Sequence, residues 1–300
     1  ISPFYPLYTL GGRRSITEAI FFSLHILSGL WKEDFDILDV DSMPHFPVFP
    51  SWIISKIKRK PLFVTWHEHW GMHWFKYLGP AGIFGLLMEK VAKTFSTKAL
   101  VVSKLTSKRL KGLKKYLIPN GITLNKFTKV KASKRKWDIA YVGRLIDHKN
   151  LDLLVQVANE KGYKTIIMGK GPEESRLRNM ANDNVHFTGF VKADKEVFSN
   201  IKSAKVFVSL SEREGFGISI IEAMACGTPV VTSNHKDNAG KFLITKGKTG
   251  YAVALQKDKV IEAIELCLKK NRSMSKGAKK FAQNFDWDKV VDKLEKVYNG

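Results

Sequence analysis

Short runs of β-branched and apolar residues alternate with longer amphipathic segments along the chain. This alternation is typical of α/β units around a parallel sheet, because each amphipathic helix covers a face of the sheet. In the first half we expect strands at Ile1–Pro3, Ile37–Val40, Leu62–Thr65 and Ala99–Val102, and helices at Ser15–Leu30, Phe49–Lys58, Gly82–Phe95 and Lys104–Leu113. In the second half we expect strands at Trp137–Val142, Thr165–Met168, Val185–Thr188, Val206–Leu210 and Pro229–Thr232, and helices at Leu151–Lys161, Glu174–Met180, Glu196–Ile201 and Ile218–Ala225. The sequence therefore predicts two doubly wound domains, with ligands at the carboxyl ends of their strands.

A change of composition near the middle of the chain indicates the domain boundary. The turn Pro119-Asn120-Gly121 precedes the polar, lysine-rich stretch Lys126–Lys136. We place an N-terminal domain at residues 1–128, a C-terminal domain at residues 129–284 and a last segment at residues 285–300. The apolar spacing in that last segment predicts an amphipathic helix over Trp287–Tyr298.

The chain is strongly basic, with 50 lysines and arginines against 28 aspartates and glutamates and a formal net charge of +22. Because the cations recur along the whole chain, it is expected to attract nucleic acid, phosphorylated small molecules or an acidic membrane surface. The two cysteines, Cys226 and Cys267, are too few for a disulfide framework or a metal cage. No stretch approaches the roughly 20 apolar residues of a transmembrane helix, and the first residues do not form a signal-peptide pattern.

The segment from Glu214 to Glu222 carries the strongest chemical signal. Gly215 and Gly217 let the backbone turn sharply and admit a ligand close to the main chain. The helix that begins near Ile218 offers free N–H groups and the positive end of its dipole to a phosphate. The two carboxylates are too far apart to serve as acid and base on one bond, and they suit hydroxyls at two ends of a polyhydroxylated ligand. The alternative is an ordinary strand, loop and helix with charged residues at the cap.

Further loops at predicted strand ends carry glycines and cations. The strand Trp137–Val142 runs into Gly143, Arg144 and Lys149, and Arg144 offers a planar fork for phosphate oxygens. The segments Gly169–Glu173 and Gly189–Val191 follow two further strands. Because the carboxyl ends of parallel strands meet at one edge of a sheet, these loops predict a site for a nucleoside diphosphate linked to a sugar.

In these motifs the sequence resembles the retaining glycosyltransferase family 4, whose members have the GT-B fold. The matching segments are Val142–Leu145 with Lys149, Gly169–Glu173, Phe187–Phe190, Glu214–Val231, Ser2–Pro6 with Gly11 and Gly12, Thr65–Glu68 and Ile118–Ile122. The resemblance covers nearly the whole chain and implies two facing Rossmann-like domains with an interdomain cleft. It also implies transfer of a hexose from UDP- or GDP-hexose to a glycan or lipid-linked acceptor, with retention of anomeric configuration.

The resemblance further implies roles for individual residues. Arg144 and Lys149 are implied to bind the diphosphate and to steady the charge on the leaving group. The implied contacts to the donor are Glu214 and the backbone of Phe216, Gly217 and Ile218 for the hexose, Glu222 for the ribose, Val191 for the base, Gly143 and Gly169 in the donor loops, Gly12 for the phosphate and His67 for the sugar from the N-terminal domain. No metal and no separate cofactor are expected, because the two cations and the helix dipole supply positive charge. The last helix is implied to return to the N-terminal domain.

Three features depart from the family pattern. Gly12 runs almost directly into Ser15–Leu30, so we expect a chain gap between Gly11 and Ile16 where a few dozen residues are absent. The loop Asp237–Gly240 replaces a usual Gly-Gly-x-x-Glu, which puts its ligand contacts in doubt. Asn150 stands where a glycine is usual and is expected to cap the following helix.

Three other interpretations compete with a glycosyltransferase. His67, His69 and His73 suggest a metal site, but interleaved tryptophans favour an aromatic wall that faces the sugar or the acceptor. The basic cluster Lys104–Lys115 suits a nucleic acid backbone, although no nucleic-acid motif is present and no nucleic acid partner is expected. A non-catalytic relative that only binds sugar nucleotides is the remaining alternative.

The expected location in the cell is based on two segments that combine basic and aromatic residues, Trp52–Lys60 and Trp74–Leu87. Such segments adsorb to anionic bilayers. We therefore expect a cytoplasmic protein, peripheral at the inner face of the membrane, with an ordinary lysine-rich surface as the alternative.

Overall fold

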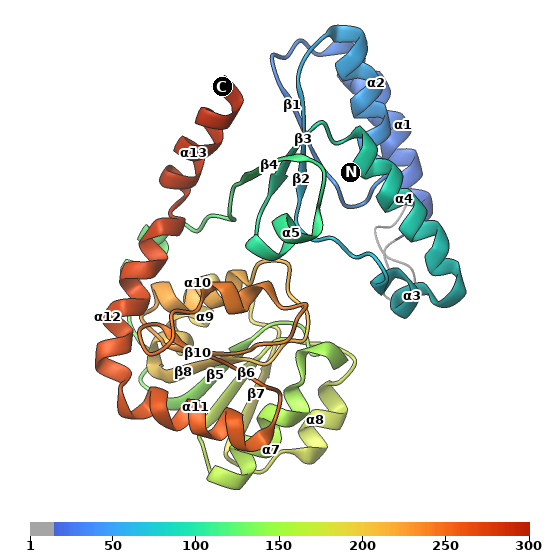
Figure 1. The fold of residues 1–300 in the computed structure, drawn as a ribbon. Helices are drawn as coiled ribbons and strands as arrows, with labels where there is room; N and C mark the ends of the chain where they lie inside the picture. The colour runs from blue at the N-terminus through green and yellow to red at the C-terminus, as the bar shows by residue number, and fades with distance from the viewer. Residues whose placement is uncertain (1–14) are drawn as a thin grey trace. The chain divides into compact units, whose positions relative to one another are not determined.

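The computed structural model describes residues 15–300, and this part of the chain divides into two compact units. The N-terminal unit holds the residues up to Ile118 together with Glu295–Gly300, and the C-terminal unit holds Pro119–Leu294. Each is an α/β unit with one parallel sheet, as the alternating pattern predicts (Figure 1). The strand expected at Ile1–Pro3, the glycines Gly11 and Gly12, and the expected chain gap lie outside the described residues.

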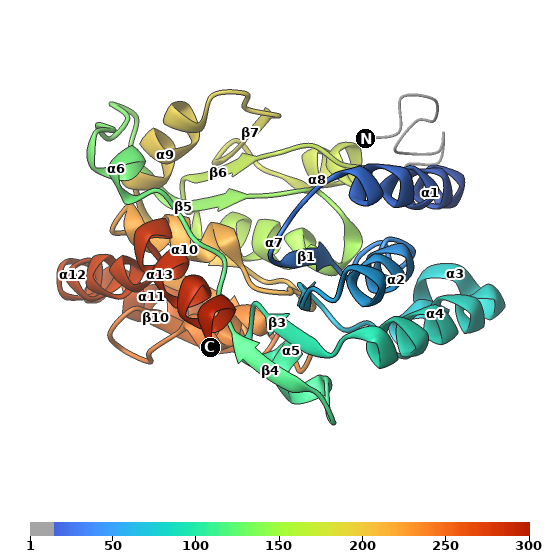
Figure 2. The same ribbon diagram turned by 90° about the horizontal axis from the view of Figure 1, so that it is seen from above.

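The N-terminal unit has a four-stranded sheet in the order β1-β2-β3-β4. Its strands are β1 Leu38–Asp41, β2 Leu62–Trp66, β3 Lys98–Val101 and β4 Lys114–Leu117. Its helices are α1 Ile16–Lys32, α2 Val48–Lys58, α3 His73–Leu78, the short 3₁₀ helix η1 Gly79–Ala81, α4 Gly82–Phe95 and α5 Lys104–Arg109. Helix α2 packs on β1 and β2 and lies between α1 and α4, while α5 packs on β3 and β4 (Figure 2).

The end of this unit differs from the prediction. The helix expected over Lys104–Leu113 ends at Arg109, and the edge strand β4 follows. Residues of β4 such as Lys114 and Leu117 are exposed, since β4 has a neighbour on one side alone. A strand with two lysines and no buried residue lacks the apolar signal by which strands are recognised.

The C-terminal unit has a six-stranded sheet in the order β10-β9-β8-β5-β6-β7. The strands are β5 Trp137–Val142, β6 Thr165–Met168, β7 Val185–Gly189, β8 Ala204–Ser209, β9 Val230–Ser233 and β10 Gly250–Val253. From β5 the chain steps outward to β6 and β7, and then returns to β8 on the other side of β5. The point between β5 and β8 is therefore the topological switch point, where open α/β sheets bind ligands.

Helices cover both faces of this sheet (Figure 1). The helical segments that follow residue 119 are α6 Leu124–Thr128, η2 Asp147–Lys149, α7 Leu151–Lys161, α8 Glu174–Met180, α9 Asp194–Ser203, α10 Ile218–Ala225, η3 Ala239–Leu243, α11 Lys257–Lys269, α12 Asn271–Ala282, η4 Gln283–Phe285 and α13 Trp287–Asn299. Buried side chains of α7, α8 and α11 form one continuous core with β5, β6 and β8. Helices α9 and α10 pack on the opposite face.

The boundary between the units lies upstream of residue 128. The backbone N–H of Ile122 donates to the carbonyl of Phe285 at 2.7 Å, and the N–H of Trp287 donates back to Ile122 at 3.1 Å. Gly121 accommodates the Trp287 ring, because a Cβ at this position would lie 2.5 Å from Cδ2. Residues 119–128 therefore fold with the C-terminal unit.

Helix α13 begins at Trp287 as predicted, and its residues from Glu295 onward belong to the N-terminal unit. Oη of Tyr298 donates to Oδ2 of Asp39 at 2.5 Å, and the Tyr298 ring lies 4.8 Å from the ring of Phe63. No helix within residues 15–300 is long and apolar enough to cross a membrane.

Candidate active site

Three loops at the carboxyl edge of the C-terminal sheet are joined by backbone hydrogen bonds. The N–H of Gly143 donates to Met168, that of Leu145 to Lys170, and that of Gly169 to Gly189, at 3.0, 3.0 and 2.9 Å. A Cβ on Gly169 would lie 1.9 Å from the carbonyl oxygen of Gly143. The glycine thus permits the close approach of the loops that follow β5 and β6. The sequence predicted that these loops share one edge, and the structure places them there.

Lys149 and Glu214 meet at the switch point between β5 and β8. Nζ of Lys149 donates to Oε1 of Glu214 at 2.5 Å, and the hydroxyl of Ser211 donates to the same oxygen at 2.9 Å. The side chains of the ion pair are only 17% and 18% exposed, so water screens them weakly. The pair therefore holds a fixed cation and a fixed carboxylate side by side.

Arg144 is held by its backbone and keeps its guanidinium exposed. Oη of Tyr141 donates to the carbonyl of Arg144 at 3.1 Å, and burial raises the pKa of the Tyr141 phenol, so the donor proton is retained. The short helix η2 brings Lys149 back toward β8, and burial lowers the pKa of the neighbouring His148. The loop after β5 therefore carries an exposed guanidinium, that of Arg144, and a half-buried ammonium, that of Lys149.

Asn150 does not cap α7 with its side chain, contrary to expectation. It adopts the left-handed conformation, with φ 50° and ψ 45°, and makes no side-chain cap hydrogen bond. Instead Nδ2 donates to the carbonyl of Leu210 at 3.0 Å. Asparagine tolerates this backbone conformation better than most residues, which explains how it replaces a glycine. Its side chain ties the loop after β5 to the end of β8.

The loop Asp237–Gly240 holds the backbone of Glu214 in place. The N–H of Glu214 donates to the carbonyl of Asp237 at 3.2 Å, and the N–H of Ala239 donates to the carbonyl of Glu214 at 2.9 Å. Asn238 is fully buried, and its Nδ2 donates to the carbonyl of Ser233 at 2.8 Å. The loop thus positions the backbone of Glu214 by hydrogen bonds of its own.

The N-terminus of α10 lies directly after the Glu214 loop. Gly217 adopts φ 96° and ψ 57°, and no side chain caps the helix. Phe216 is buried, with its ring 5.8 Å from that of Phe285, whereas Ile218 is exposed. The Phe216 side chain therefore anchors the loop, while uncapped N–H groups at the start of α10 can receive an anion.

Glu222 lies one turn further along α10, in a site that favours its neutral form. Burial raises the pKa of its carboxyl to about 7, and the nearby Asp194 carboxylate acts in the same direction. Among the described residues, none forms a hydrogen bond with this carboxylate. A poorly solvated carboxylate of this kind has unused capacity to accept hydrogen bonds from hydroxyl groups.

At the end of β7, Val191 is half-buried beside Phe190, whose side chain is 70% exposed. These residues follow Gly189, which lies at the edge strand of the sheet. An exposed aromatic ring next to an aliphatic side chain provides a surface on which a planar base can stack.

His67 belongs to the N-terminal unit, where it follows β2. Its Nε2 lies 3.0 Å from Oδ1 of Asp41, and this hydrogen bond raises the pKa of the imidazole. Gly12 lies outside the described residues. In the segment after His67, the rings of Trp70 and Trp74 lie 4.6 Å apart at an interplanar angle of 37°, and His73 meets Trp70 edge to face. No group of three potential metal ligands occurs within residues 15–300.

The supporting residues Ser211 and Asn238 were missed by sequence reasoning. Both are fully buried and polar. The polar run between a strand and Glu214 could have pointed to Ser211. Asn238 lies in the loop Asp237–Gly240, which departs from the family pattern but was given no role.

Comparison with known proteins shows to which family the chain belongs. The family described as "Glycosyl transferases group 1" matches residues 123–285. The chain is 24% identical over 212 residues to a poly(ribitol-phosphate) alpha-N-acetylglucosaminyltransferase of Staphylococcus aureus, with 64% of this chain and 42% of that protein covered. It is 28% identical over 170 residues to a GDP-mannose-dependent alpha-mannosyltransferase of Mycobacterium tuberculosis, with 54% of this chain and 44% of that protein covered. The chain spans about half the length of the curated relatives it matches.

Solved structures show the same fold. Sucrose-phosphate synthase from Thermosynechococcus elongatus superimposes with a TM-score of 0.74 at 21% identity, covering 93% of this chain and 76% of that one. The Anabaena protein HepE in complex with UDP-glucose superimposes with a TM-score of 0.75 at 17% identity, covering 93% and 82%.

Proposed function

Since this chain belongs to the glycosyl transferases group 1 family and has the GT-B fold, we propose that it transfers a hexose from a nucleoside diphosphate hexose to a glycan or lipid-linked acceptor with retention of configuration. The observation that carries the proposal is the Lys149–Glu214 pair at the switch point, beside the uncapped start of α10. A fixed cation, a helix N-terminus and a carboxylate at one edge match a diphosphate joined to a polyhydroxylated ring.

In this reaction Arg144 and Lys149 bind the diphosphate. As the bond to the sugar breaks, negative charge grows on the departing nucleoside diphosphate, and cations fixed beforehand stabilise it without reorganisation. Lys149 is already held by Glu214, so the site is preorganised before the donor arrives. We propose that these charges and the α10 terminus take the place of a metal ion. The reaction is then expected to proceed in the presence of a chelator.

The carboxylates hold the two ends of the donor. Glu214, with the backbone of Phe216, Gly217 and Ile218, binds the hexose, and Glu222 accepts hydrogen bonds from the ribose. Val191 contacts the base, Gly143 and Gly169 keep the loops close enough to admit the diphosphate, and Gly12 and His67 contribute from the N-terminal unit. The nucleoside is uridine or guanosine. A structure of the same fold is described as a complex with UDP-glucose, and a relative in sequence is described as GDP-mannose-dependent.

A donor panel tests this function. The purified chain is incubated with UDP- and GDP-hexoses and with a glycan and lipid extract that supplies acceptors, in the presence of a chelator. Release of the free nucleoside diphosphate is measured, with the hexose passing to an acceptor or to water. Release of UDP or GDP that depends on Lys149 supports a transferase. Binding of a donor without release would instead favour the non-catalytic relative, and binding of nucleic acid without binding of any donor would favour the basic module.

We further propose that the protein works in the cytoplasm at the inner face of the membrane. Its basic charge and the segments Trp52–Lys60 and Trp74–Leu87 support this location. A lipid-linked acceptor would be presented at that surface.

A further inference from the structure

The outer face of the three helices α1, α2 and α4 in the N-terminal unit is unusually apolar. Ten of the sixteen exposed large hydrophobic side chains in the described chain lie on these helices. They are Ile16, Ile20, Leu24 and Trp31 on α1, Ile53 and Ile57 on α2, and Ile83, Phe84, Leu87 and Val91 on α4. The helices lie in one layer with α2 in the middle, so one helical layer carries all ten side chains (Figure 2). Concentration of this kind marks an interaction surface, whereas single exposed apolar residues do not.

The exposed charges on the same three helices are of one sign. Their acidic residues are Glu18 and Glu89, which are 2% and 1% exposed, and the rest of their charged side chains are lysines. Lys32, Lys56 and Lys90 are exposed. Exposed carboxylates occur just beyond α1, at Glu33, Asp34 and Asp36, and Asp36 pairs with Lys60. The cations on the helices themselves, next to exposed apolar side chains, are complementary to an anionic bilayer.

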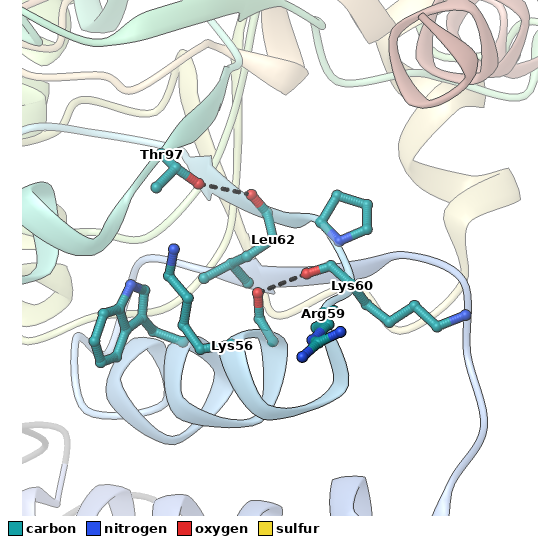
Figure 3. A pocket seen from close by; sticks show the side chains of 8 residues that line it. Lys56, Arg59, Lys60, Leu62 and Thr97 are labelled. Carbon is teal, nitrogen blue, oxygen red and sulfur yellow. Dashed lines mark hydrogen bonds between the residues drawn. The ribbon is translucent and has the colours of Figure 1, made fainter.

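A cavity of about 500 Å³ opens at the carboxyl end of α2, beside this face (Figure 3). It is lined by Trp52, Ser55, Lys56, Arg59, Lys60, Pro61, Leu62 and Thr97. The two hydroxyls are already engaged, since Ser55 donates to the carbonyl of Lys60 at 2.7 Å and Thr97 to that of Leu62 at 3.4 Å. The cavity therefore offers a ligand mainly positive charge and the face of Trp52.

Within this cavity, Arg59 is the most informative residue. It has φ 54° and ψ 36°, a left-handed helix-terminal conformation that glycine adopts with less strain. Neither an ion pair nor a hydrogen bond of its guanidinium occurs among the described residues, while Lys60 pairs with the exposed Asp36 and Lys56 lies 6.0 Å from the Trp52 ring. Figure 3 shows Lys56 and Arg59 along the same side of α2. A large cation is thus kept at a position whose backbone favours a small residue.

We propose that this cavity takes the phosphate of an anionic phospholipid while the outer face of α1, α2 and α4 rests on the bilayer that presents it. Lys56 and Arg59 contact the phosphate, and Trp52 sits at the level of the headgroups, where indole rings are enriched. Ile53 and Ile57 are four residues apart and lie on one stripe of α2 next to Lys56, from which they reach the acyl region. The inference rests on the proposed membrane location and not on the transferase reaction.

The test is sedimentation of the full chain with vesicles of phosphatidylcholine alone or with 30% phosphatidylglycerol, at about 0.15 M salt. The double variant Lys56→Gln/Arg59→Gly removes both cations and relieves the backbone of residue 59. The control, Lys269→Gln/Lys280→Gln, removes two exposed cations of the C-terminal unit. A cation at an anionic surface contributes roughly fivefold to binding, so the first pair is expected to weaken binding about 25-fold and the control less than twofold.

Several outcomes would overturn the proposal. These are no binding to the anionic vesicles, equal loss in the control variant, or binding of soluble glycerol phosphate or an acidic peptide to the cavity without binding to vesicles. A second variant, Ile53→Gln/Ile57→Gln, keeps all charges and must also weaken binding. Thermal unfolding of every variant shows that the protein is folded. Release of nucleoside diphosphate without vesicles, measured in parallel, separates failure of the docking surface from failure of the transferase function.

Discussion

Lys149 of the loop after β5 forms an ion pair with Glu214 of the loop after β8, with 2.5 Å between Nζ and Oε1. This contact joins the two strands that flank the switch point, and it occupies the cation that a diphosphate would use. Under the proposed function, a bound donor would share Lys149 with Glu214, and the Glu214 carboxylate would accept hydrogen bonds from both the lysine and the hexose.

Glu214→Ala should separate the contribution of Lys149 to diphosphate binding from the contribution of Glu214 to hexose binding. Loss of the carboxylate leaves Lys149 available, so affinity for the nucleoside diphosphate alone should stay equal or rise. Affinity for the intact donor and turnover should both fall, because the hexose loses its partner. Calorimetry with UDP or GDP and with the sugar nucleotide measures this ratio. An equal loss of affinity for both ligands would place Glu214 away from the sugar.

Glu222 should make donor binding depend on pH. Its pKa is raised to about 7, so the carboxyl is protonated below this pH and ionised above it. If ribose hydroxyls donate to the carboxylate, affinity should increase as the pH rises from 6 to 8. Glu222→Gln should remove this dependence, and Glu222→Ala should weaken donor binding with little change in turnover. A pH profile that persists in Glu222→Gln would assign the titration to another group.

The same residue should affect stability, with a sign that follows from its raised pKa. The carboxyl is harder to ionise in the folded state than in the unfolded chain, where its value is near 4.5. Stability is therefore lost as the pH rises from about 4.5 to about 7, by at most about 3 kcal/mol. Glu222→Gln should be more stable than the parent at pH 8 and equal to it near pH 4.5.

Gly169→Ala should force apart the loops after β5 and β6. Its Cβ would lie 1.9 Å from the Gly143 carbonyl oxygen, and residue 169 has φ 146°. We expect a loss of about 1–3 kcal/mol of stability together with loss of donor binding. Gly162→Ala is the matched control, since Gly162 has φ 64° but nothing within 4 Å of an added Cβ. The control should lose a little stability and keep normal donor affinity. Unchanged donor binding in Gly169→Ala would show that the site tolerates wider loops.

His45 should make the N-terminal unit sensitive to acid. It is buried beside Trp66 and Trp74, and neither ring nitrogen has a hydrogen-bond partner within the described residues. Burial lowers its pKa against the opposing effects of Glu89 and of the Ser42 backbone, while His69 acts in the same direction as burial. Because the unfolded chain binds the proton more readily, stability should fall as the pH drops through about 6.5. His45→Leu should flatten this fall and add about 1 kcal/mol at neutral pH, as measured by thermal unfolding. A steeper fall in the variant would contradict this assignment.

Most of the sheet framework could be predicted from the sequence. The strand Trp137–Val142 and the helices Leu151–Lys161 and Ile218–Ala225 have the predicted bounds, because apolar periodicity and glycine turns agree there. The prediction failed where tertiary contacts determine the local structure. β4 carries lysines at the edge of a sheet, and Asn150 bonds to Leu210, which lies 60 residues away. The support given by Ser211 and Asn238 is likewise invisible without the fold, since it depends on which buried partners face them.

The central claim is that Arg144 and Lys149 stabilise the departing diphosphate. The most direct measurement is turnover and donor affinity, determined separately, for Arg144→Ala, Lys149→Ala and the exposed control Lys195→Ala. Cations that oppose growing charge act more strongly in the transition state than in the bound donor, so each of the first two variants should lose about 100-fold or more in turnover and much less in donor affinity. The control should retain both. Near-normal turnover with only a raised donor requirement in Arg144→Ala and Lys149→Ala would contradict the diphosphate assignment and the mechanism built on it.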